Sequence, residues 1–307
     1  MTLQFGVILP GGTAPEQLEL AVLAERAGWD GVFVWEAGYG VDAWSLLAAM
    51  AARTTRVRLG TMLTPLPWRR PWKVASQVAT LDQLSEGRAT LGIGVGAVTD
   101  HLPVTGEPTD LRLRASMMDE GIDLIRTLWL GGRSYHGEHY HYDVRTDDMA
   151  AAARPVQQRI PIWVVAVWPR RKSMRRVLRC DGVIPGHEPS TEAVREMRAW
   201  LAARGAPPTV DILAEGETPT ADPAEAAALV RSGLGPRPGA HGGWRRAGRC
   251  RTTPPTGWPR SEPASRPAHP AVFSVCERRA SLPRPGFAAP PGIAGGPGLA
   301  GHPGVAG

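Results

Sequence analysis

The stretch "RLGTMLTPLPWRRPWKVASQVATLDQLSEGRATLGIGVG", residues 58–96, holds two apolar runs on either side of a helical pattern. The first run belongs to a strand that begins near residue 57, and the second begins at residue 89. Between them Pro71 stands where a helix can start, and Val74, Val78 and Leu81 recur at helical spacing. The almost unbroken apolar run after residue 89 is typical of a parallel strand covered by helices. The stretch therefore predicts a strand–helix–strand unit.

The same rhythm continues through the first 231 residues. Strands are predicted to begin near residues 5, 31, 57, 89, 161, 182 and 210. Helices are predicted to begin at capping residues such as Asp42, and Ser190 or Thr191. A further helix is predicted over residues 117–130, and a β-hairpin is predicted around His136. Alternating units of this number favour a (β/α)8 TIM barrel, an α/β fold of roughly 250 residues. A doubly wound open sheet is the alternative, and the glycine-rich turns do not separate the two.

Residues 232–307 differ in composition from the rest of the chain. They contain 15 Gly and 14 Pro in 76 residues, a density that predicts disorder rather than helix or strand. They carry 10 Arg against 2 Glu, a net charge of +8, whereas residues 1–231 carry a net charge of −2. We therefore divide the chain into an incomplete barrel domain at residues 1–231 and a disordered Gly/Pro/Arg-rich tail at residues 232–307.

The barrel still requires an eighth strand, which the spacing predicts near residues 235–250. That stretch has no apolar run, and Pro236 and Pro238 would interrupt a hydrogen-bonded ladder. One hypothesis is a frameshift near Arg231, in keeping with 33 Arg against 2 Lys, which would leave a non-catalytic remnant with an unclosed barrel. The rival is a basic arm that binds nucleic acid, which the few aromatic residues and the absence of RGG repeats disfavour.

Residues 1–12 and the cysteines of the chain bear on where in the cell the protein is expected. Residues 1–12 have neither a basic segment nor a long apolar core, and no stretch approaches the roughly 20 apolar residues that a membrane helix requires. Cys180, Cys250 and Cys276 are scattered without metal-binding spacing. We expect a cytoplasmic protein without a membrane span.

Residues 58–96 resemble the bacterial luciferase-like superfamily of flavin- and deazaflavin-dependent oxidoreductases. The resemblance extends to "AERAGWDGVFVWE" at 24–36, to "GEPTDLRLRASMMDEGIDLIRTLW" at 106–129, and to "IPIWVVAVWP…RRVLRCDGVIP" at 160–185. It implies a luciferase-like TIM barrel that binds reduced FMN or the deazaflavin coenzyme F420. It also implies a monooxygenase or reductase activity on a small organic substrate, and a homodimer.

In such a barrel the site lies at the carboxyl ends of the strands. The resemblance implies that a bulge in the third strand, often with a non-prolyl cis peptide, presses on the cofactor ring. The cofactor phosphate is expected at the start of the helix after residue 168, where backbone N–H groups favour an anion. The residues so assigned to the cofactor are Trp35, Thr61, Met62, Leu63, Val95, Gly96, Trp168, Arg170 and Arg171.

Two positions depart from the pattern of relatives that transfer hydride to the deazaflavin. Those relatives often carry a histidine and an acid where this chain has Ala37 and Ala97. Acid–base catalysis needs a titratable group within reach, so a sugar-phosphate dehydrogenase mechanism is disfavoured. The candidate catalytic residues are Glu36 and His187, and Asp100 and His101 are further acid–base candidates.

The histidines of "YHGEHYHY", residues 135–142, raise the possibility of a metal site, because His139 and His141 would share one face of a strand. Zinc sites usually gather ligands from more than one segment, so we predict a polar hairpin without a metal.

The stretch "WRRPWK" at 68–73 could stack on nucleic acid, but its place between strand and helix favours a loop with Arg70 near the barrel mouth.

Overall fold

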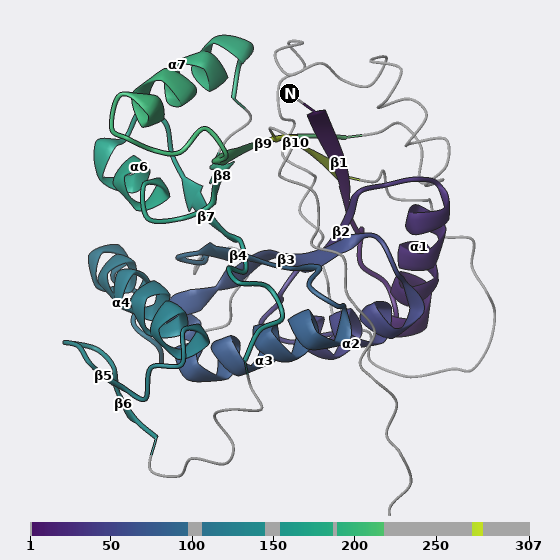
Figure 1. The fold of residues 1–307 in the computed structure, drawn as a ribbon, viewed down its shortest axis with the longest axis horizontal. Coiled ribbons are helices and arrows are strands. Elements are labelled where there is room, and N and C mark those ends of the chain that lie inside the picture. The colour runs from purple at the N-terminus through teal and green to yellow at the C-terminus, as the bar shows by residue number, and fades with distance from the viewer. Residues whose placement is uncertain (1, 98–105, 145–153, 187–188, 218–271, 279–307) are drawn as a thin grey trace, which may run out of the picture.

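The barrel predicted from the sequence is present in a computed structural model, which describes residues 2–97, 106–144, 154–186, 189–217 and 272–278. Seven parallel strands curl around a common axis (Figure 1). They are β1 Thr2–Ile8, β2 Gly31–Val34, β3 Arg58–Pro65, β4 Ala89–Gly94, β7 Ile162–Ala166, β8 Gly182–Pro185 and β9 Asp211–Glu217. All seven predicted strands are thereby confirmed, and the open-sheet alternative is excluded.

The eighth position of the ring is filled from the tail. Strand β10, Val272–Arg278, pairs antiparallel with both β1 and β9 and closes the barrel. The prediction that the tail forms no strand is therefore wrong for these residues. Residues 271–282 contain neither Gly nor Pro, and β1 and β9 supply the hydrogen-bond partners of β10 within this stretch. The stretch at 235–250 lies outside the described residues.

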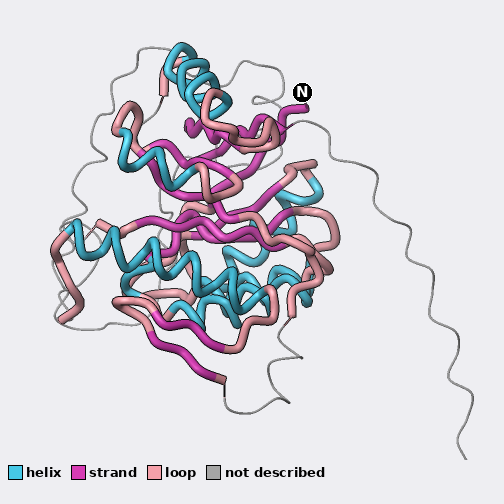
Figure 2. Tube along the Cα trace, turned by 60° about the vertical axis from the view of Figure 1, so that its left-hand side comes forward, coloured by secondary structure: helices cyan, strands magenta, loops and turns pink. Residues whose placement is uncertain are grey.

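Helices cover the outside of the sheet (Figure 2). They are α1 Ala14–Arg26, α2 Ala43–Arg53, α3 Pro71–Leu84, α4 Leu111–Trp129, α6 Arg171–Val177 and α7 Thr191–Ala202, with a 3-10 turn at Leu66–Trp68. The predicted caps Asp42 and Ser190 bind backbone N–H groups of the first turns. Helix α4 begins earlier than residue 117, because the Asp110 side chain caps it at Leu113 N, 2.8 Å away. None of the described helices has the length and apolarity needed to cross a membrane.

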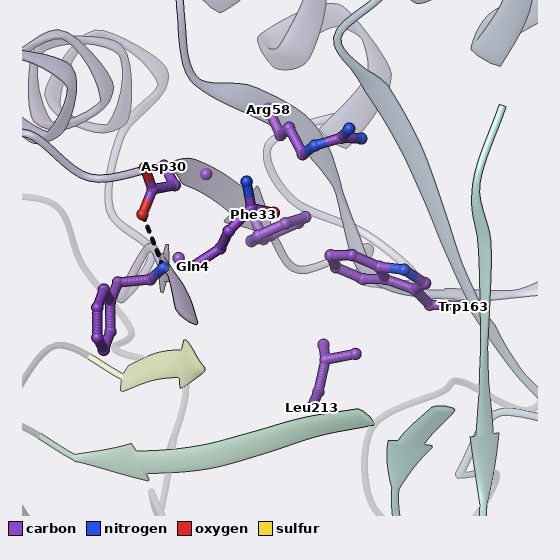
Figure 3. Close-up of a pocket in the computed structure, with 9 residues that line it drawn as sticks. Gln4, Asp30, Phe33, Arg58, Trp163 and Leu213 are labelled. Atoms are coloured by element: carbon purple, nitrogen blue, oxygen red, sulfur yellow. Dashed lines mark hydrogen bonds between the residues drawn. The ribbon is translucent and has the colours of Figure 1, made fainter. Parts of the chain in front are cut away.

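The barrel interior is filled by side chains. Phe33 and Trp163 meet with ring centroids 5.4 Å apart, and Leu213 lies near them (Figure 3). A cavity of about 20 Å³ beside them also borders Gly6 and Gly31, away from the carboxyl ends of the strands. This space suffices for a water molecule and not for a cofactor.

The amino end of the sheet is held by Arg88, which is 8% exposed. Its guanidinium donates to the carbonyl oxygens of Thr54 at 2.7 Å, Val57 at 2.8 Å, Ser85 at 2.7 Å and Ala51 at 3.3 Å. It also donates to the Thr54 hydroxyl at 3.0 Å. One side chain thus ties the end of α2, the start of β3 and the end of α3 together.

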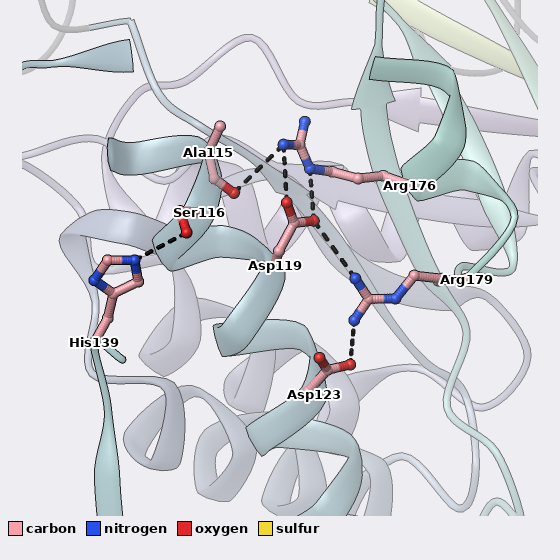
Figure 4. A network of polar contacts seen from close by, with 7 residues as sticks. All are labelled: Ala115, Ser116, Asp119, Asp123, His139, Arg176 and Arg179. Atoms are coloured by element: carbon pink, nitrogen blue, oxygen red, sulfur yellow. Dashed lines mark hydrogen bonds and ion pairs between the residues drawn. The ribbon is translucent and has the colours of Figure 1, made fainter. Parts of the chain in front are cut away.

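Helix α4 connects the barrel to the hairpin and to α6. Its Asp119 accepts two hydrogen bonds from Arg176, at 2.8 and 3.0 Å, and Asp123 pairs with Arg179 (Figure 4).

On the other side of α4 the predicted hairpin docks on Glu120. The hairpin consists of β5 Ser134–His136 and β6 His141–Asp143. That carboxylate accepts the backbone N–H groups of residues 138, 139 and 140. Burial raises the pKa of the Glu120 carboxyl, but these bonds together outweigh it and leave the pKa below its ordinary value.

Candidate active site at the mouth of the barrel

A bulge interrupts β3 where the strand reaches the mouth. The register with β4 shifts between Thr61 and Thr64, and the peptide bond between Met62 and Leu63 is cis. The Thr61 hydroxyl lies 2.8 Å from that of Thr64 and donates to the Gly92 carbonyl oxygen at 3.2 Å. The bulge and the non-prolyl cis peptide are therefore present where the sequence resemblance implied them.

The three residues of the bulge have different environments. Thr61 is fully buried, and Met62 belongs to the interior cluster of the barrel. Leu63 is half-buried, and its side chain lies over Gly94, where a Cβ would approach both of its methyl groups to 3.0 Å. The side chain of the half-buried Val165 lies 3.4 Å from the same point. Of the three, Leu63 contributes an apolar surface at the mouth.

An ion pair joins the loop after β2 to the loop before α3. Glu36 follows β2 and has a side chain that is 5% exposed, and it pairs with Arg69 from the loop before α3. Trp44 Nε1 also donates to Glu36, at 3.3 Å, while Arg69 Nη2 donates to Gln77 at 2.8 Å. Burial lowers the pKa of the Arg69 guanidinium from its ordinary value. Glu36 is thus a paired, buried carboxylate.

Replacing Arg69 by Met is expected to lower the free energy of unfolding by about 2 to 3 kcal/mol, because Glu36 loses its charge partner in a buried place. Urea denaturation measures the change. Adding Glu36→Gln to the same chain should recover part of the loss by removing the uncompensated charge. The matched control is Arg70→Met, since Arg70 is exposed and lies over the Trp72 ring at 5.9 Å. Equal losses for the two single variants would contradict the assignment.

Sequence reasoning missed Arg69 and favoured its neighbour Arg70. It also missed Arg114, a residue of α4 that is 6% exposed. Arg114 Nη1 donates to the carbonyl oxygens of Val95 and Gly96, both at 2.7 Å. Arginines are frequent on this helix and in this loop, so only the folded arrangement distinguishes the buried ones.

The other predicted site residues lie around the rim. Trp35 is 58% exposed directly after β2, and Val95 and Gly96 are half-buried after β4. Across the barrel, Trp168 Nε1 donates to Glu196 at 3.0 Å, and its ring contacts Trp200 edge to face. Arg170 occupies the N-cap position of α6 without a side-chain capping bond, and Arg171 is the first residue of the helix; both are exposed. His187, Asp100 and His101 lie outside the described residues.

The hairpin histidines do not gather around one point. His136 pairs with Asp143 at 3.3 Å and contacts the ring of His141, whereas His139 Nε2 lies 2.9 Å from the Ser116 hydroxyl. Glu120, Glu138 and His139 come close enough to share a cation. Both Glu120 oxygens already accept backbone N–H groups, so this group is accounted for as the docking site of the hairpin.

A comparison with protein families adds to this geometry. The family model described as luciferase-like monooxygenase matches residues 2–272 of the chain. The chain belongs to the luciferase-like monooxygenase family. The match continues past Arg231, so it does not favour the hypothesis that the fold stops being encoded there.

Individual relatives of this luciferase-like protein fall into two enzyme types. An F420-dependent glucose-6-phosphate dehydrogenase of Nakamurella multipartita is 35% identical over 164 residues, which are 50% of this chain and 47% of the relative. A 4-hydroxyprotoasukamycin monooxygenase of Streptomyces nodosus subsp. asukaensis is 38% identical over 128 residues, 40% of this chain and 34% of the relative. The chain thus spans half or less of the length of these curated relatives.

Solved structures of similar fold were also found. An F420-dependent secondary alcohol dehydrogenase in complex with an F420–acetone adduct superposes with a TM-score of 0.58 at 24% identity, covering 68% of this chain and 66% of the other. A monooxygenase from Streptomyces bottropensis superposes with a TM-score of 0.54 at 28% identity, covering 64% and 62%. These likenesses agree with the luciferase-like fold.

Proposed function

We propose that this chain is a flavin- or deazaflavin-dependent oxidoreductase that acts on a small organic substrate at the barrel mouth. The observation that carries the proposal is the bulge at Met62–Leu63, which leaves Leu63 as an apolar surface beside Gly94. Because Gly94 has no Cβ, the Leu63 side chain can lie directly over the backbone of β4. An isoalloxazine or deazaflavin ring needs such an apolar bed with a few polar groups at its edge.

The named relatives support the choice of cofactor. Two of the similar proteins use F420 by their names, and a further solved structure, of a Baeyer–Villiger monooxygenase component, contains FMN. When bound, either cofactor would supply hydride chemistry, and reduced FMN would also supply oxygen chemistry. The phosphate of the cofactor is assigned to the start of the segment at Trp168–Arg171, where Arg170 and Arg171 are exposed.

The protein's own side chains would position the cofactor ring and exclude water from it. Trp35, Leu63 and Val95 would contact the ring and shield it, while the buried Thr61 fixes the bulge from behind. Glu36 is bound by Arg69 and Trp44, so we assign it to orienting the loop after β2 rather than to moving a proton. The chemistry then depends on the cofactor more than on an acid–base side chain of the described mouth.

The test separates this function from that of the sugar-phosphate relatives. Ala37 and Ala97 are both exposed at the mouth, and neither can accept a proton. We expect glucose 6-phosphate not to reduce F420 on this chain, and a panel of small ketones, alcohols and aromatic substrates to change the oxidation rate of bound reduced cofactor. Stopped-flow absorbance measures both. Rapid reduction of F420 by glucose 6-phosphate would overturn the substrate class proposed here.

A further inference from the structure

We infer that Arg114 is a positioning residue for the cofactor, acting through the backbone that leaves the barrel after β4. The inference rests on the proposed function. Both of its short hydrogen bonds, to Val95 O and Gly96 O, arise from the single atom Nη1. These two residues directly follow Gly94, over which Leu63 lies. The guanidinium therefore fixes the segment that forms one edge of the proposed cofactor bed.

The backbone geometry explains why residues 95–96 need hydrogen-bond donors from another element. Gly96 has a φ of +77°, so the chain turns sharply away from β4 at this point. The carbonyl groups of Val95 and Gly96 lie beyond the last residue of β4, and buried carbonyls without partners are costly. Arg114 supplies both partners from α4, a helix that is itself tied to α6 through Asp119.

The charge of Arg114 is hard to explain by stability alone. Arg114 is buried, none of the ion pairs between described residues involves it, and its Nε has no hydrogen-bond partner there. Two hydrogen bonds to carbonyl groups, with Nε unpartnered, offset only part of the cost of burying the guanidinium. The desolvation cost of burying the Arg114 guanidinium is offset if the side chain holds the edge of a binding site in place and favours an anionic ligand there.

The test compares Arg114→Met and Arg114→Lys with the wild-type chain. Because both bonds come from one nitrogen, a lysine ammonium can restore at least one of them. The matched control is Arg126→Met, on the same helix, where Arg126 pairs with Asp181 at 3.1 Å before β8. Measurements are the dissociation constants of FMN and F420 by fluorescence, and hydrogen exchange of the amides at residues 95–97.

For Arg114→Met we expect cofactor binding on the order of tenfold weaker, and faster exchange at residues 95–97. Arg114→Lys should recover part of both, and Arg126→Met should lower thermal stability without changing either. Wild-type affinity in Arg114→Met, or equal weakening in Arg126→Met, would overturn the inference. If the wild-type chain binds neither cofactor, the proposed function fails, and the exchange measurement still decides whether Arg114 clamps the segment.

Discussion

Replacing Arg88 by Met is expected to lower the free energy of unfolding by about 3 to 5 kcal/mol. Arg88 binds the carbonyl groups of four residues and the Thr54 hydroxyl at the amino end of the sheet. Methionine fills a similar volume but donates no hydrogen bond, so several buried acceptors would lose their partners together. Since whole domains are stable by only about 5 to 15 kcal/mol, this single change removes a large part of the total.

Urea denaturation followed by circular dichroism measures the Arg88 effect. The control is Arg53→Met, because Arg53 pairs with Glu19 on the surface at 3.3 Å with both side chains more than half exposed. Surface pairs of this kind contribute about 0 to 1 kcal/mol. A loss at Arg88 no larger than the loss at Arg53 would contradict the role given to Arg88.

Replacing Gly92 by Ala is expected to disrupt the mouth of the barrel and to abolish cofactor binding. A Cβ at Gly92 would collide with the carbonyl oxygen of Thr61, so the backbone of β3 or β4 would have to move. Overpacking of a well-packed site typically costs about 1 to 3 kcal/mol, and more when backbone must shift. The collision occurs at the bulge that carries Leu63, so binding should suffer beyond the loss of stability.

The matched comparison is Gly94→Ala, two residues along the same strand. There the added Cβ would meet the methyl ends of Leu63, which can rotate away, rather than a backbone oxygen. We expect Gly94→Ala to fold and to weaken cofactor binding, and Gly92→Ala to be the less stable of the two. Thermal unfolding with and without cofactor measures both changes. Greater stability of Gly92→Ala would contradict the packing described for the bulge.

The periodic part of the fold could be predicted from the sequence. Strands such as Gly31–Val34 are buried on both faces and read as apolar runs, and Pro71 and Asp42 mark the helix starts through local chemistry. Strand β10 was missed because its antiparallel place in the ring depends on long-range pairing with β1 and β9. No local signal gives the direction in which a late segment enters a sheet.

The candidate site, too, could be predicted from the sequence only in part. The bulge at Met62–Leu63 came from family resemblance, since an apolar strand end looks the same with or without it. Arg69 and Arg114 could not be distinguished from neighbouring arginines, because their burial arises from how α3 and α4 pack on the barrel. The position of Glu36 was predicted correctly at the end of β2, whereas its pairing with Arg69 became visible only in the folded chain.

The most direct test of the central claim is titration of the purified full chain with FMN and with F420, each oxidised and reduced. We predict saturable binding of one of them, and loss of that binding in Leu63→Glu, with retention of the fold in the variant checked by circular dichroism and thermal unfolding. Binding of neither cofactor to a chain that unfolds cooperatively would contradict the account.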